Sequence, residues 1–133
     1  DLTPLPVGQA HVVRQGERVV ILAFGTLLHA AALAAEQHNT TLVDMRWVKP
    51  LDEALLAQLV QTHTHFVTIE DSSKQGGAGS AVGEWLAAHG CTAKILNLGL
   101  PDQFIDQGDY MALYAAHGLD EKSIASTIST FVA

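Results

Sequence analysis

Short apolar runs alternate along this chain with segments of helical periodicity, and this alternation limits the possible folds more than any other feature. We predict strands at the runs VVILAF (19–24), TTLVDM (40–45), FVTIE (66–70) and AKILN (93–97). The first run is almost wholly apolar, as expected for a strand covered on both faces. Because strands and helices alternate, we predict an α/β fold with three α/β/α layers. Its mostly parallel sheet of about five strands includes one antiparallel strand.

Helical segments follow the predicted strands. We predict helices from Gly25-Thr26 to about His38, over 51–63 with Asp52 at its start, and from Gly77 to His89. A loop and a short helix that closes at Gly118 come next. The last helix starts at Asp120, and its predicted buried face consists of Ile124, Ile128, Phe131 and Val132.

The N-terminal part of the chain predicts a hairpin. In QAHVVRQGERVVILAF (9–24), two apolar runs flank Gln15-Gly16-Glu17, a turn short enough to make the two strands antiparallel neighbours. We expect the first of them at or near an edge of the sheet. The chain starts with DLTPLPVGQ and has no initial Met, so we expect residues 1–8 to be a linker from a preceding domain and 9–133 to form the domain itself.

Composition and charge exclude several classes of function. The formal net charge is −7, and the seven Lys and Arg residues are scattered from Arg14 to Lys122, so we expect no nucleic-acid partner. No apolar run approaches the roughly 20 residues that cross a bilayer, and we expect no membrane contact. Cys91 is the single cysteine, which excludes an internal disulfide and suits a cytoplasmic protein.

One predicted strand end carries an unusual sequence, VTIEDSSKQGGAGSAVGEW (67–85), at the edge of the sheet where α/β folds bind ligands. Its glycines do not fit a dinucleotide fingerprint, because the last one comes one residue late. They do not fit a phosphate loop either, because no Lys follows them. Glu70 and Asp71 just upstream would repel a phosphate. We therefore interpret the glycines as sites of close packing.

Candidate catalytic and metal-binding residues are incomplete. His63 and His65 are the only close histidine pair, and without a second pair we expect surface or helix-end histidines, not metal ligands. Ser80 lies in no G-x-S-x-G motif, and Cys91 has no neighbour in sequence that would activate a thiol.

The acidic residues at the strand ends have simpler interpretations. We expect Glu70 and Asp71 to face water or a helix N-terminus, and Asp44 to form a salt link with Arg46. The residues alone predict no catalytic, cofactor-binding or metal-binding set.

Three segments together resemble the C-terminal domain of 1-deoxy-D-xylulose-5-phosphate synthases, thiamine-diphosphate enzymes of the transketolase group. They are TLVDMRWVKPLDEALL (41–56), VTIEDSSKQGGAGSAVGEWL (67–86) and LNLGLPDQFIDQG (96–108). The resemblance runs in register over nearly the whole chain. It departs from the family pattern at DSSKQ, where many synthases are less polar, and at Gln107, where many relatives have His.

The resemblance implies what the complete enzyme does. It condenses pyruvate with glyceraldehyde 3-phosphate, releases carbon dioxide and forms 1-deoxy-D-xylulose 5-phosphate for isoprenoid, thiamine and pyridoxal phosphate synthesis. Thiamine diphosphate and Mg²⁺ belong to the two preceding domains of such enzymes, so we expect no cofactor in this segment and no activity of the segment alone. The enzyme is expected to be a homodimer.

The carboxyl edge of the sheet is then expected to contact the preceding domains or the second subunit. The candidate interface residues are Arg46, Glu70, Asp71, Gln75, Gly76, Gly77, Gly79, Ser80, Asp102 and Phe104. Two alternatives stay open. The domain is a regulatory module that binds a small anion or metabolite through helix N-termini at Thr26 and Gly77, or it belongs to another transketolase-group enzyme.

Overall fold

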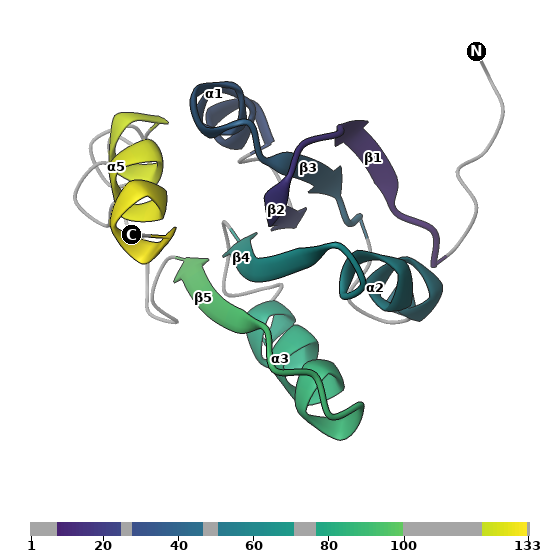
Figure 1. Ribbon diagram of the computed structural model, residues 1–133. Coiled ribbons are helices and arrows are strands. Elements are labelled where there is room, and N and C mark those ends of the chain that lie inside the picture. Colours follow the sequence, from purple (N-terminus) through teal and green to yellow (C-terminus); the bar gives the residue numbers. More distant parts are fainter. Residues whose placement is uncertain (1–7, 25–27, 47–50, 71–76, 100–120, 133) are drawn as a thin grey trace, which may run out of the picture.

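The computed structural model describes residues 8–24, 28–46, 51–70, 77–99 and 121–132 (Figure 1). Five strands form one sheet in the order β1-β3-β2-β4-β5. The strands are β1 (His11–Arg14), β2 (Arg18–Phe24), β3 (Thr41–Asp44), β4 (His63–Glu70) and β5 (Lys94–Gly99). The helices of the described part are α1 (Leu28–His38), α2 (Glu53–Leu59), α3 (Ala78–Ala88) and α5 (Glu121–Val132).

The sheet is parallel except at one edge, and helices cover both of its faces. β2, β3, β4 and β5 run parallel, whereas β1 pairs with β3 antiparallel. α1 and α5 pack on one face and α2 and α3 on the other (Figure 1). This architecture confirms the predicted three-layer α/β fold.

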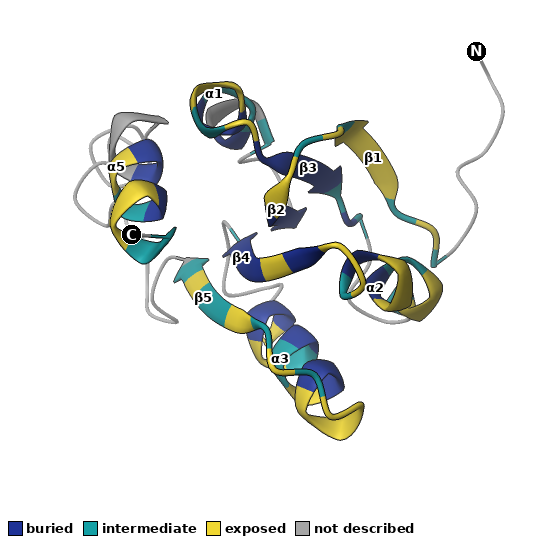
Figure 2. Cartoon of the chain, viewed as in Figure 1, coloured by how far each residue is buried: buried dark blue, intermediate teal, exposed yellow. Residues whose placement is uncertain are grey.

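β2 is the centre of the molecule, and every residue of its apolar run is buried (Figure 2). Successive strand residues point to opposite faces, so this run feeds two cores. Val19, Ile21 and Ala23 pack towards α1 and α5, and Val20, Leu22 and Phe24 pack towards α2 and α3. On the first face, α1 contributes its small buried residues Ala31, Ala34 and Ala35.

The predicted hairpin is wrong in its partner, although the first strand does lie antiparallel at an edge. β1 pairs with β3, with His11 opposite Asp44 and Val12 opposite Val43. β2 already pairs in parallel with β3 on one side and with β4 on the other, so it has no free edge for β1.

The turn after β1 crosses the end of α1 instead of closing a hairpin. The Gly16 amide donates to Thr41 Oγ1 at 3.0 Å, and the Glu17 amide donates to the Asn39 carbonyl at 2.9 Å. A Cβ atom on Gly16 would overlap the backbone of Asn39 and Thr40. Glycine is therefore needed here for close backbone approach, not for a two-strand turn.

The start of α2 confirms its prediction. Asp52 is the N-cap, and its Oδ1 accepts a hydrogen bond from the Leu55 amide at 3.1 Å. The helix ends at Leu59, earlier than expected, and β4 begins already at His63. α5 buries Ile124 and Ile128 as predicted, whereas Phe131 and Val132 of the predicted face are only half-buried.

The predictions for Thr26, for the short helix closed by Gly118 and for Asp120 lie outside the described residues. Among the helices of the described part, none has the length and apolar character needed to cross a membrane.

Candidate functional site

The carboxyl ends of the parallel strands meet at one edge of the sheet, which we call the carboxyl edge. β2, β3, β4 and β5 end there at Phe24, Asp44, Glu70 and Gly99. α3 begins at this edge, and the antiparallel β1 also starts beside it, because His11 lies opposite Asp44. All the predicted interface residues that the structure describes lie here.

Glu70 closes the N-terminus of α3. Its Oε2 atom accepts a hydrogen bond from the Gly79 amide at 2.9 Å, next to the N-cap residue Gly77. The first amides of a helix have no partner within the helix, and a carboxylate there is stabilised by the helix dipole. The prediction that this acid faces a helix N-terminus is confirmed for Glu70. The helix end that a bound phosphate would need already holds a carboxylate.

Gly77 and Gly79, at the start of α3, are glycines for different structural reasons. Gly77 is exposed and has φ +91°, a left-handed conformation that side chains rarely adopt. Gly79 is buried, and a Cβ there would lie 2.6 Å from Asn97 Oδ1 and 2.9 Å from Thr68 Oγ1. Thr68 of β4 donates a hydrogen bond to Asn97 Oδ1 of β5 at 2.5 Å. This hydrogen-bonded pair of side chains faces α3. The close packing of α3 on β4 and β5 therefore explains why residue 79 is glycine.

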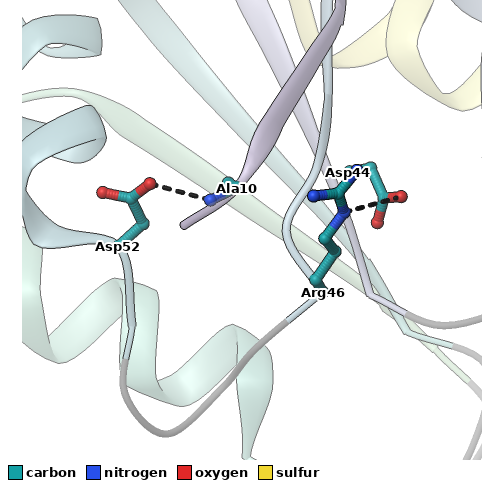
Figure 3. A network of polar contacts seen from close by, with 4 residues as sticks. All are labelled: Ala10, Asp44, Arg46 and Asp52. Carbon is teal, nitrogen blue, oxygen red and sulfur yellow. Dashed lines mark hydrogen bonds and ion pairs between the residues drawn. The ribbon is translucent and has the colours of Figure 1, made fainter. Parts of the chain in front are cut away.

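Asp44 and Arg46 form the predicted salt link at the end of β3 (Figure 3). Arg46 Nε lies 3.6 Å from Asp44 Oδ2, and the side chains are 23% and 27% exposed. Arg46 has φ +62°, so the chain turns sharply after the buried Met45. This turn sets the guanidinium at the carboxyl edge, partly open to solvent.

Asp52 has a second contact that the sequence did not predict (Figure 3). Besides capping α2 with Oδ1, it accepts a hydrogen bond from the Ala10 amide at Oδ2, 2.8 Å away. One carboxylate therefore fastens the beginning of β1 to the beginning of α2. No local signal marks this pairing, because the two residues are 42 positions apart in the sequence.

The expectation of surface histidines is wrong for His63 and His65, which are only 3% and 8% exposed. The helix-end alternative is confirmed for His63, whose ring contacts the carbonyl of Leu59, the last residue of α2. β4 starts at His63, so both residues belong to a central strand. His63 Nδ1 lies 2.9 Å from the Thr62 hydroxyl and 3.2 Å from the Leu59 carbonyl. Nε2 is hydrogen-bonded to the Thr41 hydroxyl at 2.7 Å. Burial lowers the pKa of His63, and its neutral ring is a hydrogen-bonded part of the core.

His65 lies on the other face and packs edge-on against Phe131 of α5, with 5.1 Å between ring centroids. Burial lowers the pKa of His65, and the charges of Arg18 and Lys94 lower it further. Within the residues that the structure describes, no group of His, Cys, Asp and Glu side chains could hold a metal ion.

The predicted interface residues fall into two sets. The structure places Arg46, Glu70, Gly77, Gly79 and Ser80 together at the carboxyl edge, with Gly77 and Ser80 exposed and Gly79 buried. Asp71, Gln75, Gly76, Asp102 and Phe104 lie outside the described residues. Sequence reasoning missed the contact of Asp52 with Ala10 and the contact of Thr68 with Asn97, because both join distant segments.

Comparisons with known proteins agree with this architecture. Residues 8–124 match the family described as "Transketolase, C-terminal domain". The chain is similar to a solved structure described as "Split gene transketolase, inactive beta4 tetramer", with a TM-score of 0.83 and 26% identity. That match covers 96% of this chain and 43% of the other.

Curated relatives are similar at higher identity. The chain is 50% identical over 128 residues to 1-deoxy-D-xylulose-5-phosphate synthase of Pseudoalteromonas translucida, covering 96% of this chain and 21% of that protein. It is 51% identical over 132 residues to the synthase of Ralstonia nicotianae, with the same two coverages. The chain thus spans about a fifth of the length of these relatives. The resemblance predicted from the motifs is confirmed.

Proposed function

Since this chain belongs to the family of transketolase C-terminal domains, we propose that it is the C-terminal structural and dimerisation domain of a thiamine-diphosphate-dependent 1-deoxy-D-xylulose-5-phosphate synthase. One observation carries the proposal. The chain is about half identical, over nearly all its length, to proteins of that name, yet it spans only 21% of each. The complete enzyme would convert pyruvate and glyceraldehyde 3-phosphate into 1-deoxy-D-xylulose 5-phosphate and carbon dioxide.

The cofactors of such an enzyme would be held elsewhere in the polypeptide. The described residues do not fit thiamine diphosphate or Mg²⁺, since they contain no cluster of metal-ligating side chains and Glu70 already occupies the start of α3. A carboxylate at that position would repel a diphosphate. No catalytic step is therefore assigned to this chain, and its role is to support the domains that carry the chemistry.

The carboxyl edge is the proposed contact with those domains or with the second subunit of a homodimer. Arg46 is partly exposed, and Gly77 and Ser80 are exposed beside it in the same edge. Glu70 and Gly79 serve this surface indirectly, because their hydrogen bond holds the start of α3 in place. Residues 1–8 would form the linker and 9–133 the domain, in a cytoplasmic enzyme that binds neither nucleic acid nor membrane.

Turnover by the full-length polypeptide tests the proposed activity. With thiamine diphosphate and Mg²⁺ added, the purified protein should form 1-deoxy-D-xylulose 5-phosphate from pyruvate and glyceraldehyde 3-phosphate, and deletion of 9–133 should abolish this. Ketol transfer between sugar phosphates without use of pyruvate would instead identify another transketolase-group enzyme.

A charged substitution tests the proposed interface. Ser80→Arg in the full-length polypeptide places a long cation at the exposed start of α3, and it should weaken the dimer at least about tenfold in sedimentation velocity, which is about 1.4 kcal/mol. Ala87→Arg is the matched control, because it adds the same side chain at an exposed position near the other end of α3. Equal dimer affinity of the two variants would remove Ser80 from the interface.

A further inference from the structure

β1 leaves one side edge of the sheet open. It pairs with β3 on one side, and no described strand pairs with its other side. Val12 and Val13 are 37% and 44% exposed, and they are the exposed large hydrophobic residues of the described part. β1 is largely exposed (Figure 2), and Val13 lies at a β-bulge, where it has no partner residue on β3.

This edge has one of the protections that natural sheet edges use, a β-bulge between Val12 and Arg14, but it lacks another. Edges are commonly shielded by charged side chains, because their free N–H and C=O groups attract other strands. The one cation with a defined position near the valines is Arg14, and it turns away from the edge. Its guanidinium donates to the Thr40 carbonyl at 2.9 Å and to Asn39 Oδ1 at 3.1 Å. The valines are therefore left uncovered.

The open edge is also held rigidly at both ends. At the start of β1, Asp52 accepts a hydrogen bond from the Ala10 amide. At the end of β1, Arg14 donates a hydrogen bond to the Thr40 carbonyl in the loop that follows α1. A strand that is already fixed loses little conformational entropy when a partner docks on it. Docking of a partner surface on this edge therefore has a small entropic cost.

We propose that the preceding domain of the same polypeptide docks on the β1 edge and covers Val12 and Val13. This inference rests on the proposed function, under which most of the polypeptide precedes residue 1, since the chain spans only 21% of its relatives. A linker of residues 1–8 reaches at most roughly 28 Å when fully extended. β1 is the strand nearest to it along the chain.

The position of β1 also makes this surface continuous with the carboxyl edge. His11 lies opposite Asp44, the residue that forms the ion pair with Arg46. A domain seated on the carboxyl edge would therefore extend around its corner onto β1. Interfaces between domains bury roughly 600 to 1,500 Å², more than two valines can supply, so both surfaces are needed.

Hydrogen exchange in the full-length polypeptide tests the proposal. The variant Val12→Thr/Val13→Thr keeps β-branched side chains, so β1 stays a strand, but it makes both exposed side chains polar. The amides of residues 11–14 should be protected in the unaltered protein, and exchange there should become at least about fivefold faster in the variant. Proteolytic cleavage within residues 1–8 should accelerate in parallel.

A matched control makes exposed apolar positions polar away from β1. Ala57→Ser/Ala88→Ser, on α2 and α3, should leave both rates unchanged. Fast exchange of β1 in the unaltered full-length protein, or cleavage rates that the valine variant does not change, would overturn the proposal. Protection that disappears on dilution would also overturn it, in favour of a second copy of the chain. These rates do not depend on turnover, so failure of the proposed activity would be seen separately.

Discussion

Gly79 and Gly83 lie one turn apart on α3, but their surroundings differ. A Cβ on Gly79 would meet Asn97 Oδ1 at 2.6 Å, and Asn97 could give way only by breaking its bond with Thr68. A Cβ on Gly83 would meet only Ile95 Cδ1, at an ordinary 3.9 Å. The same substitution should therefore have opposite effects at the two positions.

We predict that Gly79→Ala lowers the free energy of unfolding by about 2 kcal/mol, because the methyl group overpacks the contact with β4 and β5. Gly83→Ala should raise it by about 0.5–1 kcal/mol, because alanine is the better helix former. Urea denaturation of the two variants measures both values. An unchanged free energy of unfolding in Gly79→Ala would show that glycine is not needed here for internal packing.

Thr40 buries a hydroxyl group between α1 and β3. Its buried Oγ1 atom has no hydrogen-bond partner among the described residues, while its amide donates to the Ala35 carbonyl of α1 at 3.0 Å. Thr40→Val removes an unsatisfied polar atom and should stabilise the protein by about 1 kcal/mol. Thr68→Val is the control, since its hydroxyl is bonded to Asn97. The thermal unfolding temperature should rise for Thr40→Val and fall for Thr68→Val.

At the scale of elements, Asp52 joins β1 to α2 with its two carboxylate oxygens. Asp52→Asn can still cap the helix with one oxygen, but its amide nitrogen cannot accept from Ala10. We predict a loss of about 1 kcal/mol for Asn and about 2 kcal/mol for Ala, measured by urea denaturation. Equal losses for the two variants would mean that the bond to Ala10 contributes nothing.

The same scale shows why the sequence predicted some features and not others. The strands and helices were predictable, since apolar runs and the Asp52 cap are local signals. The partner of β1 could not be predicted, because Gly16 in a short turn fits a hairpin as well as a turn that crosses the end of α1. Only the competition of β3 and β4 for the edges of β2 decides between these, and it involves residues far apart in sequence.

The candidate site divides in the same way. Glu70 was predicted to face water or a helix N-terminus because it is an acid at the end of a strand, and the structure shows the second. Burial of His63 was not predicted, since a histidine pair between a helix and a strand is usually exposed. It depends on where β4 starts and on Thr41, which comes from another strand.

At the scale of the whole molecule, stability should depend on pH through the buried histidines. The pKa of His63 lies below 6.5 in the folded state, mainly because of burial, and that of His65 is lowered too. The unfolded state therefore binds more protons, so stability is fully present above about pH 6.5 and is lost as pH falls through the lower folded-state values.

We predict that the free energy of unfolding falls between pH 7.5 and pH 5, and that His63→Gln makes this fall shallower. Urea denaturation at several pH values measures the slope. An unchanged slope in His63→Gln would mean that this histidine titrates alike in both states.

The central place of β2 has a consequence during synthesis. Its apolar run is translated before its neighbours β3 and β4, and β4 ends only at Glu70. At roughly 5–20 residues per second, the nascent run VVILAF stays without both neighbours for a few seconds. During that interval the run exposes apolar side chains that are buried in the folded domain.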